Sequence, residues 1–346
     1  MKKFLYLIIF LPFLLAACDV HEWPDTPESV DFHLRLHYET DMTKWEHQYE
    51  DYNIIEQGYG ETYDNRLSTG KIRYVVRAYP ISKNQYSTKE YTREFVITKD
   101  ISQGYDHEVT LQLPGGDYNI MVWSDLMESG NDSPFYNPDN FAEIVLHGKH
   151  KGNTDYRDAF RGSESLSLVA DIMTKLPDTL DINMQRPLAK FEIVTTDLQE
   201  FIDKEFEYLS KVAASRGEEA PSRVDIDKYK AIIHYAGYMP NTYNINSDKP
   251  IDSNMGTLIE SKLNVLNNEE ASFGFDYVFI GNTKGSVMIQ IGLYDDEREI
   301  ALSDPFNVPL LRNHHTVLRG SFLMQEASGG LKIEPDFDGN HNIIIE

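Results

Sequence analysis

The strict alternation of apolar and polar residues near the start of the chain constrains its fold most. The apolar residues are Val30, Phe32, Leu34, Leu36 and Tyr38. The polar residues between and after them are Asp31, His33, Arg35, His37 and Glu39. A period of two places one set of side chains on a single face of a β-strand. We therefore predict a first strand with Val30, Phe32, Leu34 and Leu36 on its buried face.

Further short strands are predicted along the rest of the chain, with turn signals between them. Residues 109–113 and 118–122 form a predicted hairpin around the turn at residues 114–117, and Pro187 opens a strand that runs to residue 196. The other predicted strands cover residues 72–79, 91–98, 165–170, 180–184, 231–235, 273–280, 287–293, 306–310 and 316–324. Such spacing is typical of β-sandwiches, so we expect an all-β protein.

One helix interrupts this pattern near residues 197–215. Its apolar residues recur at helical spacing, Thr196 or Asp197 can cap its start, and Gly217 can end it. The length of the chain fits two domains better than one. We predict an N-terminal β-sandwich over residues 30–185 and a C-terminal β-sandwich over residues 186–346 that contains the helix.

The N-terminus has the features of a secretory signal. Lys2 and Lys3 precede an apolar run at residues 4–15, which is too short to cross a bilayer and contains a proline. Leu15 and the small residues Ala16 and Ala17 stand directly before Cys18, and we predict that they form the signal-peptidase recognition site. We predict a signal peptide over residues 1–17 and a tether over residues 18–29, which is acidic and contains two prolines.

Cys18 is the only cysteine of the chain, so it has no partner for an internal disulfide. Leu-Ala-Ala-Cys resembles a bacterial lipobox, which implies cleavage before Cys18 and a covalent lipid, with acyl chains such as palmitate, on that residue. The alternative is an ordinary signal peptide with an incidental cysteine. Several acyl chains would hold the protein firmly at a membrane.

The charge of the chain excludes some partners. It has 32 basic and 56 acidic residues. Removal of Lys2 and Lys3 would leave 32 − 2 = 30 basic residues and a formal charge of 30 − 56 = −26. Such a surface repels nucleic acid and anionic lipid headgroups, so we expect no nucleic-acid partner.

No pattern for catalysis or metal binding stands out, and we expect no enzyme, no small-molecule substrate and no cofactor besides the lipid. The sequence contains no glycine-rich phosphate loop, no Gly-x-Ser-x-Gly and no zinc-type spacing. His314 and His315 are adjacent, so on a strand they point to opposite faces; we expect surface or turn positions. Residues 334–342 match a calcium loop poorly, and a solvated turn is the better interpretation.

Aromatic residues leave one alternative open. The chain has 21 tyrosines and three tryptophans, and exposed coplanar rings could stack on sugars, although rings on strands serve a core equally well. Trp23 lies in the tether, where it could pack on the first domain or contact a partner. A surface glycan-binding lipoprotein is therefore the alternative function.

Six segments, taken in order, resemble the Bacteroidota fimbrial anchor-subunit family, relatives of the fimbrillins. They are DVHEW at 19–23, GDYNIMVW at 116–123, RDAFRG at 157–162, MQRPLAKFEI at 184–193, GYMPNTYN at 237–244 and PLLRNHHTVLRG at 309–320. The resemblance covers nearly the whole chain. It implies an outer-membrane, cell-surface lipoprotein of two transthyretin-like β-sandwiches, with other fimbrial subunits as partners and without catalytic residues.

The resemblance also implies strand exchange between subunits, in which an extended strand of one fills a groove of its neighbour. Stalk subunits of such families lose their first strand by cleavage after a basic residue. Here no lysine or arginine lies between Cys18 and Leu34, and Arg35 lies inside the first predicted strand, which favours a retained strand. Ile343, Ile344 and Ile345 form either a final strand of their own sandwich or a segment for a neighbour.

Overall fold

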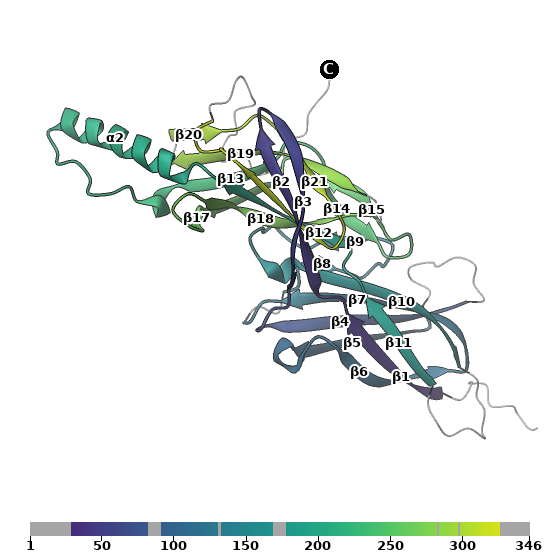
Figure 1. Ribbon diagram of the computed structural model, residues 1–346. Helices are drawn as coiled ribbons and strands as arrows, with labels where there is room; N and C mark the ends of the chain where they lie inside the picture. The colour runs from purple at the N-terminus through teal and green to yellow at the C-terminus, as the bar shows by residue number, and fades with distance from the viewer. Residues whose placement is uncertain are drawn as a thin grey trace, which may run out of the picture.

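The computed structural model describes residues 29–81, 91–130, 133–168, 178–281, 284–296 and 298–325. Over these residues the chain consists mainly of β-strands, with one α-helix (Figure 1). The predicted all-β class with one helical insertion is confirmed. The residues predicted for signal cleavage, Cys18, the tether up to residue 28 and the isoleucines at 343–345 lie outside the described residues.

The first β-sandwich packs a three-stranded sheet against a four-stranded sheet, with strand orders β11-β1-β6 and β10-β7-β4-β5. The strands of the smaller sheet are β1 (Ser29–Tyr38), β6 (His107–Pro114) and β11 (Asp178–Met184). The larger sheet contains β4 (Lys71–Pro80), β5 (Arg93–Asp100), β7 (Gly116–Met127) and β10 (Ala159–Leu168). The hairpin predicted over residues 109–122 is wrong: β6 pairs with β1 and β7 pairs with β4 and β10, so the turn between them carries the chain from one sheet to the other.

Apolar side chains from both sheets fill the first sandwich. Phe32, Leu34 and Leu36 of β1 are buried in one cluster with Ile120 and Val122 of β7. The intervening side chains of β1 are exposed or partly exposed. The alternation that predicts this strand therefore also sets which of its faces is buried.

The second β-sandwich contains a six-stranded sheet, β17-β18-β12-β22-β2-β3, and a five-stranded sheet, β16-β13-β19-β20 with β21 beside β19. The six-stranded sheet consists of β2 (Asp41–Glu50), β3 (Asn53–Asp64), β12 (Leu188–Thr195), β17 (Asn264–Val265), β18 (Ala271–Phe279) and β22 (His314–Gly320). The other contains β13 (Lys230–Tyr235), β16 (Leu258–Lys262), β19 (Gly285–Asp295), β20 (Arg298–Leu302) and β21 (Phe306–Leu310). Their inner faces share one buried apolar cluster.

The hairpin of β2 and β3 crosses the expected boundary between the two sandwiches. The predicted domain boundary between residues 185 and 186 placed this hairpin in the first sandwich. In the structure, β2 instead pairs in parallel with β22 of the second sandwich. The sequence did not predict these strands because their alternation is broken. The β2–β3 register shifts twice, the buried side of β2 includes His47, and β3 is mostly exposed.

A four-stranded sheet, β15-β14-β9-β8, connects the two halves of the chain a second time. β8 (Tyr136–Asn137) and β9 (Ile144–Leu146) precede residue 185, whereas β14 (Met239–Asn244) and β15 (Lys249–Asn254) follow it. β9 pairs with β14. Contacts that join the sandwiches therefore come from segments far apart in the sequence.

Helix α2 (Leu198–Arg216) confirms the predicted helix, and its far end projects from the second sandwich (Figure 1). Asp197 is the N-cap residue, and Gly217 ends the helix with a left-handed φ of 70°, which glycine adopts at little cost. The Asp197 side chain does not cap the helix; its carboxylate accepts hydrogen bonds from the backbone N–H groups of Leu323 and Met324. Short 3₁₀ turns are η1 (Ile101–Gln103), η2 (Asp155–Arg157) and η3 (Ile226–Lys228).

Candidate functional site

The first strand lies in the middle of its sheet. β1 pairs with β6 in antiparallel and with β11 in parallel orientation, and residues 32–36 have partners on both sides. Phe32, Leu34 and Leu36 are buried, and the partly buried Val30 packs against their cluster. Loss of this strand would therefore unpair two neighbours and open the core.

Arg35, the first basic residue after Cys18, lies within this doubly paired stretch. Its backbone pairs opposite Asp181 on one side and Glu108 on the other. Its Nε lies 3.6 Å from Glu108 Oε1, and its Nη1 lies 3.8 Å from Asp181 Oδ1. Proteases cut exposed, unpaired segments most readily, so the peptide bond after Arg35 is protected by the two ladders.

β1 continues almost directly into β2 of the second sandwich. Only Glu39 and Thr40 separate the two strands. The N–H of Glu39 donates to the carbonyl of Met184 at 3.1 Å, and the carbonyl of Thr40 accepts from the N–H of Asn65 at 3.2 Å. β2 is itself flanked by β22 and β3. Residues 29–50 thus form one path through an interior strand of each of two sheets.

Arg186 fixes this path at the junction of the sandwiches. Its Nε and Nη2 donate to the carboxylate of Asp158 at 2.7 and 2.8 Å. Its remaining N–H groups donate to the carbonyls of Thr40 at 3.0 Å and Asp41 at 3.3 Å, and to Asn313 Oδ1. A guanidinium has five N–H donors, and all five have acceptors here. Both side chains of the Arg186–Asp158 pair are buried.

A second buried pair joins Arg157 to Asp276 of β18. The Asp276 carboxylate also lies 2.8 Å from His150 Nε2 and accepts a hydrogen bond from the Tyr235 hydroxyl at 2.6 Å. Burial alone would raise the pKa of Asp276, but attraction to Arg157 and contact with His150 outweigh it, and the pKa is lowered. Asp276 is therefore a buried, compensated carboxylate.

Asp248, in the turn between β14 and β15, pairs with two arginines. Arg312 Nη1 donates to its oxygens at 2.8 and 2.9 Å, and Arg161 Nε donates at 2.9 Å. Burial would raise the pKa of Asp248, yet the hydrogen bonds from Arg161 and Arg312 lower it. Arg312 Nε also donates to the carbonyl of Arg186 at 2.7 Å, which links this group to the first buried pair.

Large aromatic side chains pack beside these ion pairs. Trp123 of β7 contacts Tyr136 of β8 edge to face, with ring centres 5.4 Å apart. Tyr243 of β14 stacks on Phe279 of β18 at 5.2 Å. All four are almost fully buried in a cluster separate from the cores of the sandwiches. The junction therefore has its own core, composed of aromatic rings and paired charges.

The motifs that carry the family resemblance meet at this junction. The segments 116–123, 157–162, 184–193, 237–244 and 309–320 supply Trp123, Arg157, Arg186, Tyr243 and Arg312 respectively. The sequence alone did not predict that these residues would lie together. Their common signal, arginine and aromatic residues within apolar strands, identifies the segments but not their partners.

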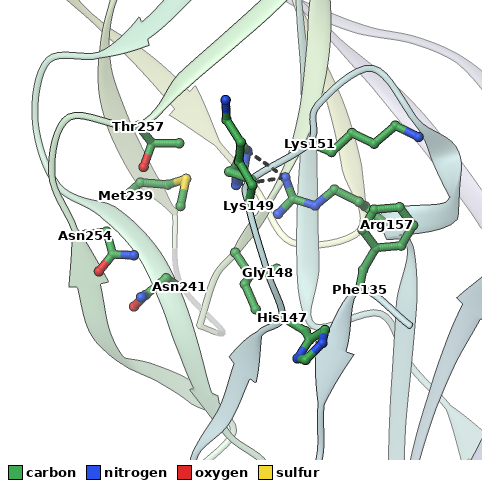
Figure 2. Close-up of a pocket in the computed structure, with 12 residues that line it drawn as sticks. Phe135, His147, Gly148, Lys149, Lys151, Arg157, Met239, Asn241, Asn254 and Thr257 are labelled. Carbon is green, nitrogen blue, oxygen red and sulfur yellow. Dashed lines mark hydrogen bonds between the residues drawn. The ribbon is translucent and has the colours of Figure 1, made fainter. Parts of the chain in front are cut away.

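A small cavity of about 90 Å³ lies beside the junction (Figure 2). Gly148 and Lys149, from the loop after β9, form one wall, and Asn241, Asn254 and Thr257 lie opposite them. The Arg157 side chain lies on a further side, where its Nη1 contacts His150 Nε2 at 2.8 Å. The sequence did not single out this loop.

The remaining candidates give a mixed outcome. His315 is buried and lies 2.9 Å from the Tyr63 hydroxyl, so its expected surface or turn position is wrong. His314 is partly buried, with Nδ1 2.7 Å from the Arg312 carbonyl. Within the described ranges no cluster of three histidine, cysteine or acidic side chains could hold a metal. Trp45 and Trp123 are buried and cannot stack on a sugar; Trp23 and residues 334–342 lie outside those ranges.

None of the described helices has the length and apolar character needed to cross a membrane.

Among solved structures, the chain is similar to a putative adhesin from Bacteroides thetaiotaomicron, with 14% identity, coverage of 83% and 82% of the two chains and a TM-score of 0.42. It is also similar to the fimbrial anchor protein Mfa2 from Porphyromonas gingivalis, with 10% identity, 79% and 81% coverage and a TM-score of 0.38. A fimbrial assembly protein from Parabacteroides distasonis shows 10% identity, 87% and 93% coverage and a TM-score of 0.38.

These solved structures are described as a putative adhesin, a fimbrial anchor protein and a fimbrial assembly protein. No curated protein matches the chain. A family model does match, over residues 27–346, and its description is "Family of unknown function (DUF6562)". That match covers both sandwiches and the junction between them, and the chain belongs to this family.

Proposed function

We propose that the chain is a non-enzymatic, lipid-anchored subunit of the outer membrane that acts at the cell surface as a fimbrial anchor or assembly subunit. A diacylglycerol group is attached to the Cys18 sulfur, residues 1–17 are then removed, and the new amino group is acylated. Other fimbrial subunits bind by β-strand pairing. The junction, which joins the two sandwiches through buried charges and rings, gives the subunit a fixed shape.

The position of β1 is the observation that carries this proposal. The predicted tether leads into a strand that is hydrogen-bonded on both sides. Tension on a lipid at Cys18 would act along β1 and load both ladders together. Because β1 continues through Thr40 into β2 and Arg186 binds the carbonyl of Thr40, the load would pass directly to the second sandwich. An anchor needs such a path.

Retention of the first strand supports an anchor over a stalk subunit. In the resembling family, stalk subunits lose this strand by cleavage after a basic residue. Here the first such residue, Arg35, is protected within β1. Cleavage there would also have to expose Phe32 and Leu34, and burial of such side chains stabilises a fold by about 1.5–3 kcal/mol each.

β3 offers an edge for strand pairing with another subunit. It is 12 residues long, and its outer side has no neighbouring strand among the described residues. Ile55 and Tyr59 on it are 45% and 57% exposed. An unpaired edge binds an extended segment through main-chain hydrogen bonds, while side chains add specificity. We assign an extended strand of another fimbrial subunit as the occupant.

The first experiment tests the anchor. Mass spectrometry of the native protein should find acyl groups on Cys18 as the first residue. Cells that carry Cys18→Ala should release fimbriae into the medium, whereas the wild-type gene restores their retention. An unmodified Cys18, or unchanged number and retention of fimbriae after deletion of the gene, would refute the proposal.

The second experiment tests the β3 edge. Ile55→Lys with Tyr59→Lys should weaken retention of fimbriae while the purified protein keeps its unfolding temperature. Phe206→Lys on α2, where the side chain is 41% exposed, is the matched control and should behave as wild type. Equal effects of the edge and control substitutions would exclude this edge but leave the Cys18 test standing.

A further inference from the structure

The cavity beside the junction differs in charge from the rest of the molecule. The sequence has 56 acidic and 32 basic residues. The cavity lining includes two lysines, an arginine and two histidines but no acidic residue. Screening limits Coulomb interactions to about 8 Å at physiological ionic strength. A ligand in the cavity would therefore respond mainly to these nearby groups.

Two of the cations are already neutralised by neighbours. Arg157 pairs with Asp276, and Lys151 Nζ lies 3.3 Å from Glu128 Oε2. Lys149, in contrast, is exposed and forms no ion pair or hydrogen bond with the part of the chain that the structure describes. Its ammonium group is available to balance an anion.

Unused hydrogen-bonding groups accompany Lys149. The side chains of Asn254 and Thr257 form no hydrogen bond with the described residues. The backbone N–H groups of residues 148–151 likewise donate no hydrogen bond to any described residue. Arg157 Nε is buried and likewise lacks an acceptor there. Hydrogen bonds from N–H groups to an ionised oxygen are about twice as strong as those between neutral groups. The cavity thus combines one free charge with several free donors.

We propose that this cavity binds the carboxylate or sulfate group of an acidic saccharide. Lys149 balances the charge of the oxyanion. Asn254 and Thr257, on the opposite wall (Figure 2), bind ring hydroxyls, for which an amide and a hydroxyl supply both donors and acceptors. Met239 adds an apolar surface to that wall. This inference goes beyond the proposed anchor role and does not depend on it.

A saccharide fits the site better than an acidic peptide. An extended peptide gains most of its affinity from an unpaired strand edge. Here β14 is paired with β15 on one side and, at Thr242 and Tyr243, with β9 on the other. Besides the backbone N–H groups of residues 148–151, the free groups around Lys149 are a side-chain amide and a hydroxyl, which match the hydroxyl-rich surface of a sugar.

Calorimetric titration of the purified protein with defined probes tests the proposal. Trigalacturonate or a sulfated chondroitin disaccharide should bind at least tenfold more tightly than neutral trigalactose and than inorganic sulfate. Binding should weaken as salt concentration rises. Lys149→Glu should abolish it, and Asn254→Ala should reduce it at least fivefold.

Lys211→Glu is the matched control, because this lysine on α2 is 72% exposed and receives the same charge change. It should bind as wild type, and circular dichroism should show all variants folded. The proposal would be overturned by no binding of either acidic saccharide, by equal loss with both lysine variants, or by equal affinity for inorganic sulfate. Equal affinity for a tetraglutamate peptide would overturn it in favour of a protein ligand.

Discussion

The core of the first sandwich and the junction between the sandwiches are stabilised in different ways. The core is apolar and is built from strands that each show alternation, such as β1. The junction combines rings with buried pairs such as Arg157 with Asp276, which are 119 positions apart. An apolar core tolerates changes of similar volume. A buried ion pair depends on both partners, because each leaves an uncompensated charge when the other is lost.

The largest effect is expected when one half of a junction pair is removed. Asp158→Ala would leave the Arg186 guanidinium buried without its carboxylate, and we expect a loss of about 3–5 kcal/mol in the free energy of unfolding. Urea denaturation measures it.

The double variant Asp158→Leu with Arg186→Met is the control. Because it removes both charges, it should recover most of the loss, as replacement of a buried pair by apolar residues is often neutral. A double variant as unstable as Asp158→Ala would show that the five hydrogen bonds of Arg186 contribute more to the stability of the junction than charge compensation does.

A smaller loss is expected in the core of the first sandwich. Leu34→Ala deletes a fully buried side chain and should lower the free energy of unfolding by about 3 kcal/mol. Val30→Ala, at a partly buried position of the same strand, should cost less than half as much. Equal costs would mean that the end of β1 is packed more tightly than its burial indicates.

The junction should also respond to acid, whereas the apolar core should not. The folded-state pKa of Asp276 is lowered, so its ionised form contributes stability above the unfolded pKa of about 3.9. That contribution is lost as the pH falls through the lower folded pKa. The stability difference between wild type and Asp276→Asn should therefore shrink below about pH 4. A difference that is constant down to about pH 2 would contradict the assigned direction.

The smallest effect is expected for Arg35→Ala. Its side chain is 44% exposed and its ion-pair distances are long, so the free energy of unfolding should change by less than about 1 kcal/mol. Limited trypsin digestion should still leave the bond after residue 35 of the wild-type protein intact. Rapid cleavage there would show that β1 opens readily and would weaken its assignment as a load-bearing strand.

Local pattern predicted much of the fold but little of the junction. β1, β6 and α2 each bury one regular face, so their periodicity is visible in the sequence. The turn after β6 is visible too, but not that β6 and β7 belong to different sheets. β2 and β3 were not predicted, because the bulges between Thr43 and Trp45 and between Glu46 and His47 interrupt the alternation. The placement of this hairpin in the second sandwich depends on parallel pairing with β22, some 270 residues away.

The candidate site divides in the same way. Cys18 is recognised from its immediate neighbours and stays a prediction. Arg186 lies in a segment that the sequence singled out, but its partners at residues 40, 41, 158 and 313 come from three separate segments. Lys149 has no distinguishing sequence context; it becomes notable because the opposite wall of its cavity is polar and free of acids.

The sequence by itself determined the all-β class, the buried face of β1, the position of α2 and the family resemblance, because each depends on residues that are neighbours along the chain. Only the tertiary structure decided that β1 is central, that β2 and β3 belong to the second sandwich and that five motifs form one junction. Those features depend on pairing between distant segments, and a buried charge reveals its partner only when the chain has folded around both.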